Sequence, residues 1–337
     1  MTKRVAVIGE CMLELKGEAF GAMTLGYGGD TFNTAVYLRR CGKAAGIEVA
    51  YATALGEDSL SEGLLERWRE QGIDTRLVRR LPGRMPGLYM IEVDPGGERS
   101  FHYWRESAAA RAYFEEPVTP LEERIEEFDA LYLSGITLAI LPEAGRDRLF
   151  ALMAKMRERG GLVVFDNNFR PRLWGSRTDA RAAFERAFSL ANIALVTADD
   201  HQALMAFTDI EAAIAHARAL PPAELIIKRG AASTLVRALE QSRFATAAGP
   251  HPHPLPQAGE GVGETAGVGA WSEAPTQRVE RVVDTTAAGD SFAGGYLARR
   301  LSGHDAVSAA THGNRVAARV IGYPGAIIPV DAMADLV

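Results

Sequence analysis

The chain has 337 residues, of which 47% are hydrophobic and 24% are charged, and its formal net charge is −6 at pH 7. This composition is typical of one large globular domain, or of one domain with an appendage, and it excludes disorder or a coiled coil as a description of the whole chain. The acidic net charge disfavours a protein that mainly holds nucleic acid.

Short apolar runs alternate with helical patterns along the chain. The first run, at 5–8, is too short for a signal peptide or a membrane span. Further buried strands are predicted at 131–133, 162–165, 193–196 and 225–227, and amphipathic helices at 63–71, 142–159, 179–191 and 209–220. This alternation predicts an α/β fold with a mostly parallel central sheet.

Three stretches do not follow this rhythm. Residues 11–28 and 86–105 are predicted to form antiparallel strands outside the main sheet, as a small β lid over the carboxyl edge where such sheets bind ligands. Residues 249–273 are rich in Pro and Gly and are predicted to be a flexible surface insertion. Its His251 and His253 have no further ligands nearby, so a solvated loop is preferred over a metal site.

The two cysteines, Cys11 and Cys41, show neither a C-x-x-C motif nor a metal-binding spacing. A reduced, cytoplasmic chain fits them better than a disulfide scaffold.

The segment 283–298 carries the strongest chemical signal. Val-Asp-Thr-Thr-Ala-Ala-Gly-Asp-Ser-Phe reads as a strand, a turn of small residues and the start of a helix. Backbone N–H groups at such a turn form an anion site for a phosphoryl group in transit. Asp290 beside this site is suited to act as a general base, although a lone Asp here would more often cap the helix.

This segment resembles the carboxy-terminal signature of the PfkB (ribokinase-like) carbohydrate kinases, Asp-Thr-x-Gly-Ala-Gly-Asp. The resemblance implies a three-layer α/β/α fold, Asp290 as the catalytic base and an anion hole made by the amides of Ala287, Ala288 and Gly289. Ala287 stands where the family usually has Gly. An Ala at this place still donates its backbone N–H.

The family's other signature is matched near the start of the chain. Gly28 and Gly29 open a predicted helix, and Asn33 follows one turn later with both donor and acceptor atoms for a polyol. The alternative role for Asn33 is a capping or solvent-facing residue. Residues 56–58 match the family's Gly-x-Asp turn between the two signatures.

Aromatic and basic residues indicate the sugar. Arg105 and Arg170 are suited to clamp a carboxylate, which favours a sugar acid over a neutral sugar, although surface ion pairs are the alternative. The resemblance to the family members that phosphorylate 2-keto-3-deoxygluconate implies that Tyr89 and Tyr103 contact this sugar acid.

The nucleotide side is less clearly marked. The segment 226–230 resembles the family's ATP loop, with Ser233 in place of a second Gly. The resemblance implies ATP contacts from Thr197, Lys228, Gly230, Asp284, Thr285, Gly289 and Asn314. Asp200 stands where the family often has a Glu that organises magnesium through water, so magnesium is expected to arrive chiefly with ATP, and a monovalent cation is a further candidate.

The sequence therefore predicts an ATP-dependent kinase for 2-keto-3-deoxygluconate, with neither nucleic acid nor membrane as a partner. Relatives that pair through their β lids imply a homodimer. The alternatives are a fructokinase or ribokinase type of sugar kinase, and a catalytically silent sugar-acid sensor that has kept the fold.

Overall fold

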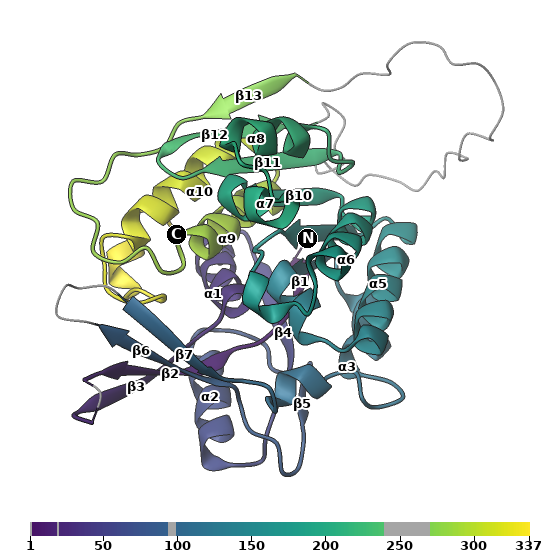
Figure 1. Ribbon diagram of the computed structural model, residues 1–337, viewed down its shortest axis with the longest axis vertical. Coiled ribbons are helices and arrows are strands. Elements are labelled where there is room, and N and C mark those ends of the chain that lie inside the picture. Colours follow the sequence, from purple (N-terminus) through teal and green to yellow (C-terminus); the bar gives the residue numbers. More distant parts are fainter. Residues whose placement is uncertain (1, 19, 94–98, 239–269) are drawn as a thin grey trace.

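The computed structural model describes residues 2–18, 20–93, 99–238 and 270–337 (Figure 1). Its main sheet has the strand order β13-β12-β11-β10-β9-β8-β1-β4-β5. The strands are β1 (Lys3–Ile8), β4 (Ile47–Leu55), β5 (Val78–Arg80), β8 (Ala130–Ser134), β9 (Leu162–Asp166), β10 (Ile193–Thr197), β11 (Glu224–Arg229), β12 (Ala232–Arg237) and β13 (Trp271–Ala274). All neighbours pair in parallel except at β12, which is antiparallel to both β11 and β13. The five predicted strands and the mostly parallel sheet are confirmed.

Helices cover both faces of this sheet. One face carries α1 (Asp30–Gly42), α2 (Ser59–Glu70), α9 (Ala288–Leu301) and α10 (Ala306–Val320). The other carries α3 (Pro120–Arg124), α4 (Gly135–Ile140), α5 (Glu143–Glu158), α6 (Arg177–Leu190), α7 (Ala198–Met205) and α8 (Ile210–Arg218). Short 3-10 turns lie at Ala109–Ala112, Ile125–Glu127, Pro171–Leu173 and Asp331–Met333. The three-layer α/β/α architecture is therefore confirmed.

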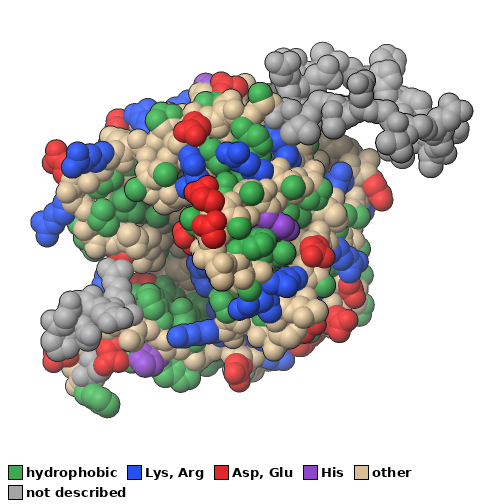
Figure 2. Space-filling model, turned by 45° about the horizontal axis from the view of Figure 1, so that its top comes forward, with side chains coloured by type: hydrophobic (Ala, Val, Ile, Leu, Met, Phe, Trp, Pro, Cys, Tyr) green, Lys and Arg blue, Asp and Glu red, His purple; other side chains and the backbone are tan. Residues whose placement is uncertain are grey.

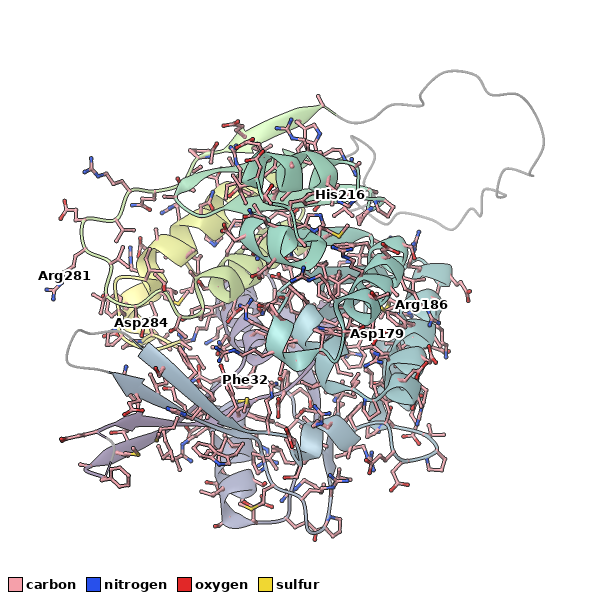
Figure 3. All side chains as sticks on the ribbon, viewed as in Figure 1. Phe32, Asp179, Arg186, His216, Arg281 and Asp284 are labelled. Atoms are coloured by element: carbon pink, nitrogen blue, oxygen red, sulfur yellow. The ribbon has the colours of Figure 1, made fainter. Side chains whose placement is uncertain are left out.

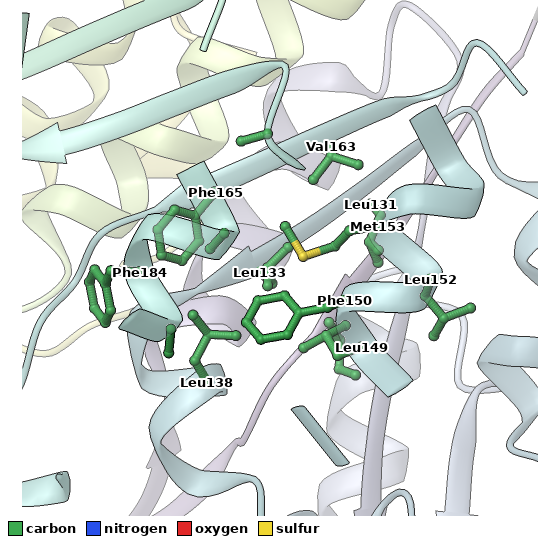
Figure 4. Packing of buried hydrophobic residues seen from close by; sticks show 14 of the residues in the cluster. Leu131, Leu133, Leu138, Leu149, Phe150, Leu152, Met153, Val163, Phe165 and Phe184 are labelled. Atoms are coloured by element: carbon green, nitrogen blue, oxygen red, sulfur yellow. The ribbon is translucent and has the colours of Figure 1, made fainter. Parts of the chain in front are cut away.

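Strands buried on both faces produce two cores rather than one. On the α5 side, Phe150 and Met153 of the helix pack against Leu131 and Leu133 of β8 and Phe165 of β9 (Figure 4). These side chains are almost fully buried. Burial of a large apolar side chain stabilises the fold by about 1.5–3 kcal/mol. This core therefore fixes the carboxyl end of β9, where the polar residue Asp166 lies.

A second, four-stranded sheet lies beside the first, with the order β3-β2-β6-β7. Its strands are β2 (Met12–Gly17), β3 (Met23–Gly28), β6 (Leu88–Val93) and β7 (Arg99–Trp104). Two antiparallel hairpins are joined by parallel pairing of β2 with β6, so the expectation of purely antiparallel strands needs this correction. In Figure 1 this sheet projects below the main body.

The predicted insertion at 249–273 lies outside the described residues except at its end. Residues 271–273 belong to β13, which pairs with β12, so these three residues are not part of a loop. His251 and His253 also lie outside the described residues. Among the helices that the structure describes, none is long and apolar enough to cross a membrane.

Candidate active site

The amino end of α1 meets β3 through two glycines. A Cβ on Gly29 would lie 2.1 Å from the carbonyl oxygen of Glu10, so no larger residue fits there without moving the backbone. A Cβ on Gly28 would lie 3.2 Å from the hydroxyl of Tyr89 and 3.7 Å from Oδ1 of Asn33. These two predicted sugar ligands therefore converge on bare backbone.

The amino end of α9 is formed by Ala287, which adopts a left-handed conformation with φ 60° and ψ 15°. This conformation suits glycine, and it costs an alanine about 1–2 kcal/mol, which gives a physical reason for the family's usual Gly. Asp284 holds the turn in place, because its carboxylate accepts the N–H of Thr286 and the N–H of Gly325, both at 2.9 Å. Figure 3 places Asp284 on the part of the main body that faces the small sheet.

The prediction of a strand directly before this turn is wrong. Val283 and Asp284 instead donate their N–H groups to the carbonyl of Ile321, at 2.8 and 3.2 Å, and form no ladder. The anion hole also needs a correction, because the N–H of Ala288 already donates to the carbonyl of Thr285 at 3.2 Å. The amides of Ala287 and Gly289 are the two predicted donors for which the described residues show no such acceptor.

Asp290 lies where the amino ends of α1 and α9 meet. Nδ2 of Asn33 donates to Oδ2 of Asp290 at 2.9 Å, and the hydroxyl of Thr34 donates to the Asp290 carbonyl at 3.2 Å. α9 has no side-chain cap, so Asp290 is not the capping residue of the alternative interpretation. Asn33 is buried, so it does not face solvent, but its Oδ1 also accepts the N–H of Gly29 at 3.5 Å, so it combines the bond to Asp290 with the capping role considered for it.

The carboxyl of Asp290 has an unusual electrostatic setting. Burial raises its pKa to about 7, the negative charges of Asp30 and Asp166 add to this rise, and Asn33 and Lys228 oppose it. The residue nevertheless keeps some solvent exposure. A carboxyl group with a pKa near neutrality is well matched to accept a proton from a hydroxyl.

Two further aspartates belong to this cluster and escaped the sequence prediction. Asp30 opens α1 and accepts a hydrogen bond from Nδ2 of Asn168 at 2.7 Å. Asp166 ends β9 and forms an ion pair with Nζ of Lys228 at 3.0 Å. The sequence could have pointed to Asp166, because it directly follows a predicted strand and such carboxyl ends line the ligand-binding edge of an open α/β sheet.

Lys228 connects this cluster to the anion hole. A Cβ on Gly289 would lie 3.5 Å from Nζ of Lys228, so the ammonium group sits next to the amide turn. Arg229 instead points to Ser233, with Nε donating to its carbonyl at 2.8 Å, and to Glu273. The position of Lys228 thus fits its predicted contact with ATP, which stays a prediction, whereas Arg229 is engaged elsewhere.

Aromatic and charged residues of the small sheet line the opposite wall. The rings of Tyr89 and Tyr103 lie 6.0 Å apart, and the Tyr89 hydroxyl donates to Glu14. Arg105 forms an ion pair with Glu10, a buried carboxyl whose pKa is raised by desolvation. Oε1 of Glu10 has no hydrogen-bond partner within the described residues. Sequence reasoning missed Glu10 and Glu14.

Arg170 lies after β9, on the main-body side. Its side chain is 50% exposed, and Nη1 contacts Oδ1 of Asp200 at 3.0 Å. The positive charge of Arg170 also reaches Asp30 and Asp290 electrostatically. Asp200, the candidate magnesium residue, is thus engaged with an arginine, and the described residues contain no group of three or more His, Cys, Asp or Glu side chains arranged for a metal.

Of the other residues predicted to contact the nucleotide, Gly230 and Thr197 lie at strand ends, whereas Asn314 binds other parts of the chain. Gly230 has φ +60° in the turn between β11 and β12, and the backbone of Thr197 is fixed by Asn167, whose Oδ1 accepts its N–H at 2.8 Å. Asn314 has a structural role, because its amide donates to the carbonyl of Pro275 at 3.0 Å and accepts from the hydroxyl of Thr234 at 3.0 Å. Its contact with ATP stays a prediction.

The two walls face each other across a hollow. The space-filling view shows the surface recessed between the small sheet, at the lower left, and the main body above it (Figure 2). The site thus combines a carboxyl group whose pKa is about 7, a lysine beside two backbone N–H groups without acceptors among the described residues, and two arginines. This combination suits phosphoryl transfer to a polyol that carries an acid group.

Comparisons with known proteins agree with this geometry. The model of the pfkB family carbohydrate kinases matches residues 2–252 and 265–333. The chain is 43% identical to the 2-dehydro-3-deoxygluconokinase of Escherichia coli K12 over 334 residues, which cover 99% of both chains. It is 42% identical to the enzyme of that name from Dickeya dadantii, over 98% of this chain and 99% of the relative.

Solved structures show the same fold. The aminoimidazole riboside kinase of Salmonella enterica, in complex with aminoimidazole riboside and an ATP analogue, aligns with a TM-score of 0.76 at 24% identity over 99% of both chains. The ATP-bound fructokinase of Xylella fastidiosa aligns with a TM-score of 0.77 at 22% identity, over 100% of this chain and 98% of that one.

Proposed function

Because the chain belongs to the pfkB family of carbohydrate kinases, we propose that its site phosphorylates 2-keto-3-deoxygluconate, also called 2-dehydro-3-deoxygluconate, with ATP as the donor. The product is 2-keto-3-deoxy-6-phosphogluconate. The observation that carries this proposal is the position of Asp290 at the start of α9, beside the amide turn and hydrogen-bonded to Asn33. A silent sensor would have no use for a carboxyl with a pKa of about 7 at this place.

The chemistry begins with proton transfer. Asp290 accepts the proton of the terminal hydroxyl of the sugar, and that oxygen attacks the γ-phosphorus of ATP while the bond to ADP breaks. The N–H groups of Ala287 and Gly289, together with Lys228, stabilise the negative charge on the transferring group. The strained turn at Ala287 keeps these donors aimed before the substrate arrives.

Arg105 and Arg170 recognise the sugar acid from opposite walls. Each guanidinium already contacts one carboxylate, Glu10 or Asp200, and keeps further N–H donors for a second. Glu10 and Asp200 thus hold the two arginines in position for the carboxylate or keto end of the sugar. Gly28, Gly29 and Asn33 take the hydroxyl groups, and Tyr89 and Tyr103 form the aromatic wall.

ATP lies along the carboxyl edge of the main sheet, between the turn at Gly230 and the start of α9. Thr197, Asp284 and Thr285 complete this edge, with Asp284 acting through the turn that it holds. Lys228 and the exposed amides fit a polyphosphate. Magnesium bound to ATP would neutralise part of the charge of its phosphates, and Asp200 is the carboxylate that would hold it through water.

The small sheet acts as the lid of the site and as a dimer interface. The face turned away from Tyr89 carries Leu25 and Trp104, which are 48% and 56% exposed. Exposed apolar residues on one face of a sheet favour pairing with a second copy. Light scattering tests this assignment, because Trp104→Glu should convert a dimer to a monomer, and a monomeric wild-type protein would contradict it.

We place the reaction in the cytoplasm, since both cysteines are free thiols and ATP is the donor.

A coupled assay of ADP release tests the substrate. With magnesium and ATP, 2-keto-3-deoxygluconate should be turned over far faster than gluconate, fructose or ribose. Arg105→Gln and Arg170→Gln should each lower kcat/KM for the acid about ten- to a hundredfold, because each loses charge-assisted hydrogen bonds. Arg186→Gln is the matched control, since Arg186 of α6 pairs with Asp147 of α5 and contacts no described residue of the site (Figure 3). A native preference for a neutral sugar would refute the arginine clamp.

A further inference from the structure

A second polar hollow lies at the other end of α9, away from Asp290. It is a groove open to solvent, of about 590 Å³, between the last turn of α9 and the first turns of α10, and this volume lies in the range of small-molecule sites. α9 has 14 residues, so a rise of about 1.5 Å per residue puts this groove roughly 20 Å from the anion hole. Its principal polar lining residues are Arg299, His304, Ser308, Thr311, His312 and Arg315.

The lining of the groove carries a net positive charge, because it holds two arginines and one carboxylate. Arg299 and Arg315 form no ion pair within the part of the chain that the structure describes, and the side chain of Arg299 contacts Nε2 of His304 at 3.5 Å. Asp305 is the carboxylate of the lining, and its Oδ1 is already engaged as the cap of α10, accepting the N–H of Ser308 at 2.8 Å. Asp335 is within electrostatic reach of Arg315 but is bound to Arg319.

His312 makes this groove different from an ordinary basic surface. The residue is only 5% exposed, it lines the groove, and its Nε2 has no hydrogen-bond partner among the described residues. Burial lowers its pKa to about 4, and Arg299, Arg315 and His304 lower it further. A buried polar atom without a hydrogen-bond partner is unfavourable, and a ligand that bonded to the ring would remove this cost.

We propose that this groove is a binding site for a phosphate dianion, separate from the active site. Arg299 and Arg315 supply two positive charges for two negative ones, and guanidinium groups match phosphate oxygens through paired N–H donors. Ser308 and Thr311 add hydroxyl groups from the same side of α10. Inorganic phosphate and a phosphorylated metabolite share this chemistry, and the 6-phosphate product is one such metabolite if the proposed function holds.

Histidine resonances report binding without reference to activity. The full-length protein, labelled with 15N in its seven histidines, is titrated with inorganic phosphate at constant ionic strength and without ATP, which would compete for the groove. The signals of His304 and His312, assigned with the variants His304→Gln and His312→Gln, should shift along one saturable curve. The pKa of His312 should rise from about 4, because a bound anion favours the protonated ring.

Variants separate a built site from general charge screening. Arg299→Gln and Arg315→Gln should each weaken phosphate binding at least about tenfold, whereas the Lys variants should retain part of it. Arg281→Gln should leave binding unchanged, because Arg281 points away from the body and does not line the groove (Figure 3). Repeating the titration with glucose 6-phosphate shows which source of phosphate binds more tightly.

Three results would overturn the proposal: shifts that do not saturate, equal shifts with chloride, or unchanged binding in both glutamine variants that retain wild-type melting curves. Such a failure would leave the kinase assignment untouched, since the groove shares no residue with the active site.

Discussion

The pH dependence of the reaction is set by the neighbours of Asp290. Burial, and then the charge of Asp30, raises the pKa of Asp290 to about 7, whereas the hydrogen bond from Asn33 lowers it. Because the base must be ionised to accept a proton, kcat/KM for the sugar should rise with pH through about 7 and level off above it. Removing Asn33 or Asp30 should therefore move this ascending limb in opposite directions.

The size of the Asn33 effect follows from its 2.9 Å bond to Oδ2. A hydrogen bond to a charged group contributes about 1.5–3 kcal/mol, and about 1.36 kcal/mol corresponds to one pKa unit. Asn33→Ala should thus raise the pKa of Asp290 and move the limb upward by about one to two pH units. Asp30→Asn should move it downward, since the amide removes a like charge and keeps an oxygen for the bond from Asn168.

The assay is kcat/KM for the sugar acid at saturating ATP and magnesium, measured across pH for the wild type and both variants. Titration of ATP itself would produce a limb at the same pH in all three proteins, so only the differences between the proteins report on Asp290. If the pH profiles of both variants shifted in the same direction, or if all three profiles were identical, this account of the pKa of Asp290 would be refuted.

Three further outcomes follow from the same residues. Ala287→Gly should stabilise the fold by up to about 1 kcal/mol in urea denaturation because it relieves the left-handed alanine, whereas Ala288→Gly should give no such gain, because Ala288 is the first residue of α9 and has no positive φ. Lys228→Met should lower kcat about 10²–10³-fold in the coupled assay, whereas Arg229→Met should not. Asp290→Asn should raise the free energy of unfolding above pH 7, by at most about 4 kcal/mol, because the native pKa is raised from 3.8 to about 7. This gain should shrink as pH falls from about 7 toward 3.8, and a gain that grows on acidification would contradict the linkage.

Local patterns predicted much of the fold and part of the site. Runs such as 162–165 and 193–196 became β9 and β10 because buried parallel strands are continuously apolar. β4, Ile47–Leu55, was missed because three of its nine residues are alanine, which is depleted in strands. The expected strand at Val283 failed because its N–H bonds go to a loop carbonyl rather than to a neighbouring strand.

The residues that the sequence did not reveal act over long sequence distances. Glu10 meets Arg105, and Asp166 meets Lys228, through pairing that only the folded chain brings about. Asp30 stood inside the amino-terminal signature, yet its influence on Asp290 depends on the meeting of α1 with α9. No local spacing encodes such contacts, whereas the turn of small residues before Asp290 is encoded locally.

The most direct test of the central claim is ADP formation from 2-keto-3-deoxygluconate and ATP by the wild type and by Asp290→Asn, with calorimetric binding of the sugar acid to both proteins. Asp290 as general base predicts a loss of turnover of at least about a hundredfold, with the Kd for the sugar acid changed less than about tenfold. Turnover by the Asn variant close to that of the wild type would contradict the claim.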